Sequence, residues 1–230
     1  MKNAILMASG LGTRMRPLTE TTPKPLITVG EKPMIETIIE ALNLANIDNI
    51  YIVVGYLGHQ FEYLTQKYSN LSIIENKDYK TINNISSIYA AKDVLLKGDC
   101  FICEADLFVS NKGIFNNIPK ESCYYGKMIK GFSSDWVFDL DENNFISRVG
   151  KNGTDCYNMS GIAYFKENEA KILAQKITQR YNTQGFENLF WDDVVNENLD
   201  SLKLKVYPIN KNDIIEIDTV EELETVRKSL

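Results

Sequence analysis

Short apolar segments alternate with helical patterns through the first half of the chain. The apolar segments are residues 3–8, 49–56, 71–77 and 100–109. The helical patterns between them are residues 32–47, 59–69 and 83–96. Strands that are apolar throughout are buried on both faces, and their alternation with helices is typical of parallel pairing. We therefore predict an α/β fold with a doubly wound, mostly parallel (Rossmann-like) sheet.

The pattern changes after about residue 115, where strand and hairpin signals replace the alternation. Turns are expected at Asp141–Asn144 and at Lys151–Gly153. The remaining expected elements are helices over 168–181 and 191–198, a strand over 202–209 and a last helix from about 219. We predict one domain over residues 1–230, with a core of about 1–115 and 200–230. An antiparallel β insertion is expected in the C-terminal half, at about 116–199.

Composition excludes several classes of partner. The formal net charge of the 230 residues is −6, and nucleic acid as a main partner would require a basic face. No signal peptide is recognisable, and no window reaches the roughly 18 apolar residues of a membrane span, so we expect a cytoplasmic protein. The four cysteines include Cys100 and Cys103, which we interpret as residues of a buried strand rather than of a zinc or redox site.

A glycine-rich loop follows the first apolar segment directly. Gly10 and Gly12 allow backbone N–H groups to approach a phosphate closely. Arg14 adds a bidentate cationic donor, and Lys24 follows on a rigid Pro-flanked segment. The loop lacks the third glycine of a dinucleotide fingerprint and the G-K-[ST] of a Walker A loop. We interpret it as a binding loop for a triphosphate.

The stretch GLGTRMRPLTETTPKPL resembles the signature of the nucleotidylyltransferases, which couple a nucleoside triphosphate to a phosphorylated metabolite. Within that superfamily the chain is most similar to short cytidylyltransferases that act on phosphocholine or on 2-aminoethylphosphonate. The resemblance runs from Ala4 to the segment Glu216–Asp218. It implies CTP as one substrate and either small amine as the other, and the residues leave the two amines open.

The resemblance also implies roles for individual residues. Arg14 and Lys24 would be catalytic, and Mg²⁺ would be held by Asp106, Glu216 and Asp218. The expected nucleotide contacts are Ala8, Gly10, Gly12, Thr13, Asn83, Asn84, Ser87, Glu104 and Ala105. Glu104 either points away from Asp106 or caps the site, and it has no metal role in this prediction.

Aromatic rings beside carboxylates indicate the site of the second substrate, which we expect in the insertion at about 116–199. These residues are Asp135, Trp136, Phe190, Trp191 and Asp192. Aromatic faces suit a trimethylammonium group, whereas carboxylates suit a primary ammonium. Lys127, in a segment that we expect to be apolar in phosphocholine enzymes, would either meet a second anion or face solvent.

Two other functions stay open. One is a sugar-1-phosphate nucleotidylyltransferase, although few polar residues suited to sugar hydroxyls are seen. The other is a non-catalytic regulatory homologue, against which the presence of Arg14, Lys24 and Asp106 argues. The residues do not distinguish a monomer from a homodimer.

Overall fold

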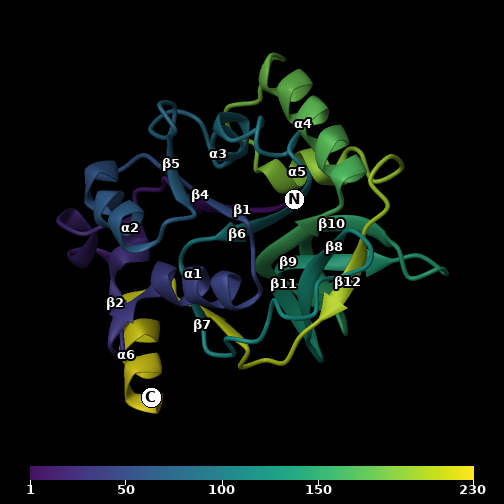
Figure 1. Cartoon of the computed structure of the whole chain (residues 1–230). Coiled ribbons are helices and arrows are strands. Elements are labelled where there is room, and N and C mark those ends of the chain that lie inside the picture. The colour runs from purple at the N-terminus through teal and green to yellow at the C-terminus, as the bar shows by residue number, and fades with distance from the viewer.

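The computed structural model describes all 230 residues and centres on a nine-stranded mixed sheet (Figure 1). Its strands are β1 (Lys2–Ala8), β4 (Asn49–Val54), β5 (Leu71–Glu75), β6 (Asp99–Glu104), β8 (Cys123–Met128), β9 (Phe132–Leu140), β10 (Ile146–Thr154), β11 (Tyr157–Phe165) and β12 (Lys205–Pro208). Seven of them follow the order β10-β9-β11-β6-β1-β4-β5, while β8 pairs with β11 and β12. Two small sheets pair β2 (Thr28–Val29) with β3 (Lys32–Pro33), and β7 (Leu107–Val109) with β13 (Ile214–Glu216).

Helices cover both faces of the sheet (Figure 1). They are α1 (Met34–Leu44), α2 (Glu62–Lys67), α3 (Ile85–Ala90), α4 (Glu167–Tyr181), α5 (Trp191–Asn196) and α6 (Val220–Ser229). Successive side chains of β1 point to opposite faces, so Ala4 and Leu6 join one core with Ile38 of α1. Ile5 joins the other core with Ile88 of α3. This two-sided burial confirms the predicted doubly wound α/β fold.

The parallel part of the sheet contains the topological switch point. β1 pairs in parallel with β4 on one side and with β6 on the other, and β5 extends the sheet beyond β4. The chain therefore builds outward from β1 in one direction and then returns to the opposite side. Ligands of open α/β sheets bind where the strand order reverses, outside the carboxyl ends of the strands. The segments that follow β1 and β6 meet at this point.

Residues 100–109 form two strands rather than the single strand that we predicted. β6 ends at Glu104, and β7 begins at Leu107 and pairs antiparallel with β13, where Glu216 lies opposite Leu107. The Val109 N–H donates to Thr37 Oγ1 of α1 at 3.0 Å, which fixes β7 against that helix. Glu104 and Asp106 interrupt the apolar run at the break, but the partner strand of β7 lies about a hundred residues later, so this pairing has no local signal.

The turn predicted at Lys151–Gly153 is wrong. β10 continues to Thr154, with an irregular register between Lys151 and Gly153, and Asn152 has a φ of 66°. A residue with positive φ next to glycine suits a β-bulge as well as a hairpin turn. The chain reverses only after Thr154, and Lys151 thereby stays on a strand.

Helical and cysteine predictions have mixed outcomes. The helix expected over 83–96 is shorter, because α3 ends at Ala90 and turns follow it. The four cysteines are free and buried, and Cys100 and Cys103 lie on β6 as predicted. None of the helices combines the length and the apolar character that crossing a membrane requires.

Asp192 is a carboxylate inside the core on the α3–α5 face. Its residue is 3% exposed, and Oδ1 accepts a hydrogen bond from the Tyr124 hydroxyl at 2.9 Å. Burial, together with the nearby charge of Asp193, raises the pKa of Asp192 to about 7, although the Tyr124 hydrogen bond opposes that shift. The folded protein thus holds a proton there that the unfolded chain releases at lower pH.

We expect Asp192→Asn to remove a pH-dependent cost of folding. Between the ordinary pKa of aspartate and about 7, the native state binds more protons than the unfolded state, so this group lowers stability as pH rises. The difference in unfolding free energy between variant and parent should grow from about pH 4 and level off above about pH 7, reaching on the order of 4 kcal/mol.

Denaturant titrations of both proteins from pH 4 to 8 measure this difference. Asp200→Asn, at an exposed position, controls for the removal of a carboxylate. A difference that stays constant over this pH range would mean that Asp192 is ionised throughout.

Candidate active site

The glycine-rich loop leaves β1 at the switch point. Gly12 has a φ of 62°, and a Cβ there would lie 3.0 Å from Lys24 Cβ and from Thr19 Cγ2. The Thr19 hydroxyl donates to the Gly12 carbonyl at 2.9 Å and holds the loop in this shape. A Cβ at Gly10 would meet no atom within 4 Å, because that backbone faces an open cleft. Glycine at position 12 is therefore required by conformation and close packing, and Gly10 leaves the backbone accessible to a ligand.

Lys24 and Arg14 converge on two carboxylates. The Lys24 side chain is only 8% exposed, and Nζ lies 2.6 Å from Asp106 Oδ2 and 2.7 Å from Asp218 Oδ1. The Arg14 side chain is 67% exposed and contacts both oxygens of Asp218, with Nη1–Oδ2 at 2.8 Å and Nη2–Oδ1 at 2.6 Å. Lys24 and Arg14, which follow the first strand, therefore form ion pairs with residues that lie at least 82 positions later in the sequence.

The charge of Lys24 is stabilised by these partners. Burial alone would lower the pKa of the Lys24 ammonium, but the charges and hydrogen bonds of Asp106 and Asp218 outweigh it and raise that pKa. A buried pair of this kind is costly to break, because removing one partner leaves the other charge without compensation. Lys24 is consequently a fixed cation at the end of β1.

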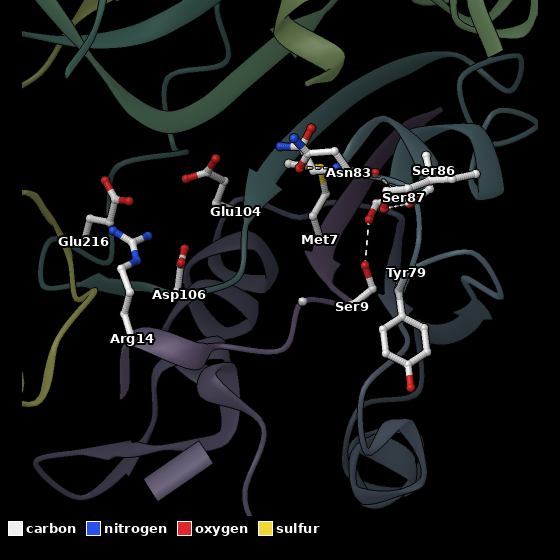
Figure 2. Close-up of a pocket in the computed structure, with 13 residues that line it drawn as sticks. Met7, Ser9, Arg14, Tyr79, Asn83, Ser86, Ser87, Glu104, Asp106 and Glu216 are labelled. Carbon is white, nitrogen blue, oxygen red and sulfur yellow. Dashed lines mark hydrogen bonds between the residues drawn. The ribbon is translucent and has the colours of Figure 1, made fainter. Parts of the chain in front are cut away.

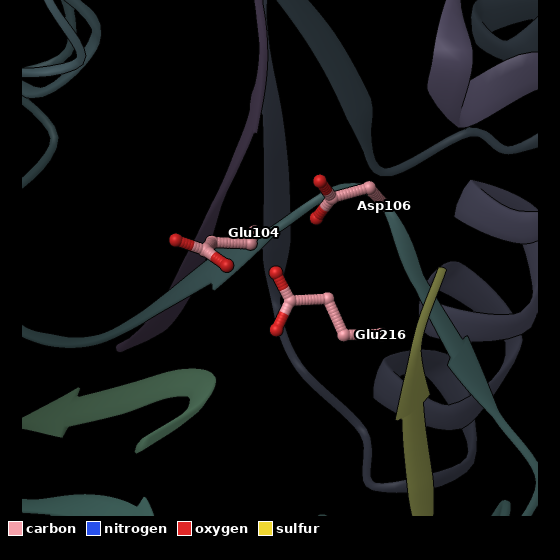
Figure 3. Close-up of side chains that lie close together, drawn as sticks. All are labelled: Glu104, Asp106 and Glu216. Atoms are coloured by element: carbon pink, nitrogen blue, oxygen red, sulfur yellow. The ribbon is translucent and has the colours of Figure 1, made fainter. Parts of the chain in front are cut away.

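Three carboxylates lie close together where β6 ends and β13 passes it (Figure 3). One oxygen from each of Glu104, Asp106 and Glu216 lies within 4.8 Å of the others. The Ile217 N–H donates to the Asp106 carbonyl at 3.3 Å, which joins the β13 segment to the end of β6. Of the two orientations left open for Glu104, the structure has the one toward the site, where its carboxylate lies beside those of Asp106 and Glu216 across the bend between β6 and β7.

This carboxylate cluster has the chemistry of a divalent-cation site. Asp106 Oδ1 is buried and has no hydrogen-bond partner in the protein, so one ligand lone pair is unused. All donors are hard oxygens, which suit Mg²⁺ or a similar ion. Asp218, the third predicted metal ligand, lies next to the cluster, where both of its oxygens contact Arg14 or Lys24.

Because the carboxylates of the cluster repel one another, their simultaneous ionisation is unfavourable without a bound cation. Desolvation of the carboxylate and the charges of Asp106 and Asp218 raise the pKa of Glu216 to about 7, although part of this residue is exposed at the cleft opening. Burial and the charges of Asp106 and Glu216 raise the pKa of Glu104 well above its ordinary value. A bound cation would reverse both effects.

Two cavities of about 260 Å³ each adjoin this cluster. The first is lined by the loop and its cations; its predicted site residues are Ala8, Gly10, Gly12, Thr13, Arg14, Lys24, Asp106 and Asp218. The second has the carboxylates at one end and serine and asparagine side chains at the other (Figure 2). Its predicted site residues are Gly10, Arg14, Asn83, Asn84, Ser87, Glu104, Asp106 and Glu216.

The side chains of Asn83 and Asn84 each form a hydrogen bond with the backbone at the start of α5 or just before it. Asn83 Nδ2 donates to the Asn188 carbonyl at 3.0 Å, and Asn84 Oδ1 accepts from the Trp191 N–H at 3.0 Å. These bonds fix the segment before α5 against α3. The Nδ2 group of Asn84, unlike its Oδ1, has no partner in the protein and is available to a ligand in the second cavity.

A third cavity, of about 430 Å³, opens on the other side of Glu104 and Glu216. Trp136 of β9 and Phe190 meet edge to face on its wall, with ring centroids 5.4 Å apart. Asp135 lies beside them, and its Oδ2 accepts a long bond from Asn158 Nδ2 at 3.4 Å. This cavity joins an aromatic corner to the carboxylate cluster.

Several predicted residues lie off the cavity walls. Ala105 is 1% exposed in the core, and Trp191 is 3% exposed and packs on Tyr124. Asp192 is bound to the same tyrosine. Lys127 lines none of the three cavities. Its ammonium is not free in solvent, because it donates to the Ile214 carbonyl of β13 at 2.6 Å.

Sequence reasoning missed other cavity residues. Ser9 lines the second cavity, and its place directly after β1 was a usable signal because strand ends meet there. Lys151 and Met159 line the third cavity. Their positions depend on a bulge and on pairing between distant strands, for which the sequence has no local signal.

Comparison with known proteins agrees with this geometry. Residues 3–122 match the family described as nucleotidyl transferase. The chain is 52% identical to 2-aminoethylphosphonate cytidylyltransferase of Lancefieldella rimae, over 96% of the chain and 90% of the relative. It is 32% identical to choline-phosphate cytidylyltransferase of Streptococcus pneumoniae, over 99% of the chain and 97% of the relative. The solved structure of CTP:phosphocholine cytidylyltransferase from Streptococcus pneumoniae superposes with a TM-score of 0.91, covering 99% of this chain and 98% of that one.

The family match extends over the loop, Lys24 and Asp106, which are the residues that meet at the switch point. Full-length similarity adds the C-terminal half, with β9, β13 and the third cavity. The chain therefore belongs to the nucleotidyl transferase family.

Proposed function

We propose that the protein transfers the cytidylyl group of CTP to 2-aminoethylphosphonate and releases pyrophosphate, with Mg²⁺ as cofactor. The observation that carries this proposal is the third cavity, where Asp135 and the carboxylate cluster lie beside the Trp136–Phe190 corner. The relative of Lancefieldella rimae, whose name states this activity, supports the same acceptor. The relatives matched over nearly the whole chain do not support a sugar-1-phosphate acceptor.

The acceptor cavity offers charge-assisted hydrogen bonds to a primary ammonium. A trimethylammonium group has no N–H and depends on aromatic faces. A primary ammonium has three donors, for which carboxylate oxygens are the strongest acceptors. Asp135 Oδ1 has no partner in the protein, while Arg14 and Lys151 offer cations to a phosphonate in the same cavity. The lining therefore suits 2-aminoethylphosphonate better than phosphocholine.

The reaction requires two anions to meet. A phosphonate oxygen attacks the α-phosphorus of CTP, the new P–O bond forms in line, and the bond to the pyrophosphate oxygen breaks. The loop N–H groups, Arg14 and Lys24 would hold the triphosphate beside the acceptor cavity. Glu104, Asp106 and Glu216 would hold Mg²⁺, which supplies charge neutralisation when bound. The nucleophile is already an anion, so no general base is needed.

A panel of acceptors tests the proposed function. Pyrophosphate release from CTP and Mg²⁺ should be fastest with 2-aminoethylphosphonate, and kcat/KM for phosphocholine should be at least about tenfold lower, because a quaternary ammonium forgoes the charge-assisted bonds. Mass spectrometry of the products identifies the group transferred. Equal or better turnover of phosphocholine would overturn the choice of acceptor, and turnover restricted to glucose-1-phosphate would overturn the function.

Asp135→Asn should raise the KM for 2-aminoethylphosphonate by about tenfold or more, through loss of a charge-assisted hydrogen bond, and leave the KM for CTP unchanged. Steady-state kinetics with each substrate varied in turn measures the split. Glu142→Gln, in the exposed turn after β9, is the matched control. An unchanged KM for the amine would remove Asp135 from its recognition.

Lys24→Met should lower kcat/KM for CTP by about 10²–10³-fold, because a fixed cation at the reacting phosphates is lost. Lys32→Met is the control, since Lys32 pairs with Glu40 at 2.6 Å outside the three cavities. Thermal unfolding of both variants reports whether the fold survives. Near-parental turnover in the folded Lys24 variant would show that this ion pair is structural only.

A further inference from the structure

Asn76 is a buried amide immediately behind the second cavity. We place the nucleoside of CTP in that cavity because Asn83, Asn84 and Ser87, three of the predicted nucleotide contacts, line it. Asn76 follows β5, is 2% exposed, and was not among the predicted site residues. Its Nδ2 donates to three serine hydroxyls: Ser86 at 2.8 Å, Ser9 at 3.2 Å and Ser87 at 3.3 Å. Its Oδ1 accepts from the Asp78 N–H at 3.0 Å, which fixes the orientation of the amide. The three serines all line the cavity.

The hydrogen atoms of this network can be counted. Asn76 Nδ2 has two of them. One of them is donated to Ser86 Oγ at 2.8 Å, and the Ser86 hydroxyl in turn donates to the Asn83 carbonyl, also at 2.8 Å. The other is shared between Ser9 Oγ and Ser87 Oγ, which lie 2.7 Å apart (Figure 2). One of these two hydroxyls donates to the other.

One hydroxyl hydrogen of the Ser9–Ser87 pair therefore has no partner in the protein. Asn76 can only donate to the pair, so neither serine can direct its hydrogen at Asn76. Ser9 and Ser87 line the cavity, so the remaining hydrogen can be donated to an acceptor atom of a bound ligand. Cytosine has two such acceptors, O2 and N3, on one edge.

We propose that Asn76 is a positioning residue for the nucleotide: by donating to Ser9 and Ser87, it makes this pair present a hydrogen-bond donor to the nucleoside. The proposal rests on the proposed function for the identity of the nucleotide. It depends on the direction of the hydrogen bonds and not only on the packing of Asn76. An aspartate at this position keeps the shape but accepts, so the hydroxyls would turn toward it and away from the ligand.

Serine variants test the hydrogen count without a new buried charge. In Ser87→Ala, Ser9 still accepts from Asn76 and keeps a free hydrogen, and the reverse holds in Ser9→Ala. Each single variant should therefore raise the Kd for CTP by only about twofold or less, so that the two single effects multiplied together stay well below the effect of the double variant. The double variant has no donor left, and its Kd should rise by about tenfold. Calorimetric titration with CTP and Mg²⁺, without acceptor, measures this binding.

Asn76→Asp should raise the Kd and the KM for CTP by about tenfold and leave the KM for the acceptor unchanged. In the Ser9→Ala/Ser87→Ala background, the same change should have no further effect. Two single-serine effects that sum to the effect of the double variant, or an equal rise of both KM values in Asn76→Asp, would overturn the proposal. Either result would mean that the network is packing alone.

The proposed function can fail separately from this inference. If the parent binds another nucleoside triphosphate in place of CTP, the acceptor panel reveals it, and the variants are titrated with that nucleotide. Melting temperatures of the serine variants identify any loss of fold. Asn70→Asp, whose parent amide bonds Asn43 and the Ile47 carbonyl away from the three cavities, controls for an amide-to-carboxylate change.

Discussion

The ion pairs of Lys24 with Asp106 and Asp218 join the three parts of the chain that form the site. Lys24 follows the glycine-rich loop, Asp106 follows β6, and Asp218 follows β13. A buried ammonium would be unfavourable without both carboxylates, and two carboxylates this close would repel each other without the ammonium. Lys24, Asp106 and Asp218 therefore neutralise one another in the free protein. Their charged groups are already in place before a triphosphate or a cation binds.

Backbone hydrogen bonds give this arrangement its rigidity. Thr37 of α1 accepts the Val109 N–H, β7 pairs with β13, and the Ile217 N–H reaches the Asp106 carbonyl. Lys127 of β8 adds a bond to the Ile214 carbonyl. Glu216 is therefore positioned from two sides of the molecule although it lies at the end of a three-residue strand. Such support is what a site with several like charges needs, since their repulsion acts to separate them.

The parts of the site that lie directly after parallel strands could be predicted from the sequence. The glycine loop and Asp106 are examples, because strand ends converge for topological reasons alone. Glu104 joins Asp106 across the bend between β6 and β7, which strand periodicity does not predict. The pairing of Asp218 with Lys24 spans 194 residues and has no local signal. Trp191 and Asp192 resemble cavity residues in the sequence, but packing on Tyr124 buries both.

Some residues line more than one of the three cavities, and others line only one. A residue that lines one cavity can be substituted without changing the others. Arg14 lines all three, while Glu104 and Glu216 line both the second cavity, proposed for the nucleoside, and the third, proposed for the acceptor. A substitution at these residues would disturb both substrates at once. Asp135, Trp136 and Phe190 line the acceptor cavity alone and come from the C-terminal half. Under the proposed function, selectivity among amines would therefore change through these residues while the loop, the cations and the carboxylates stay the same, which agrees with full-length relatives named for two different acceptors.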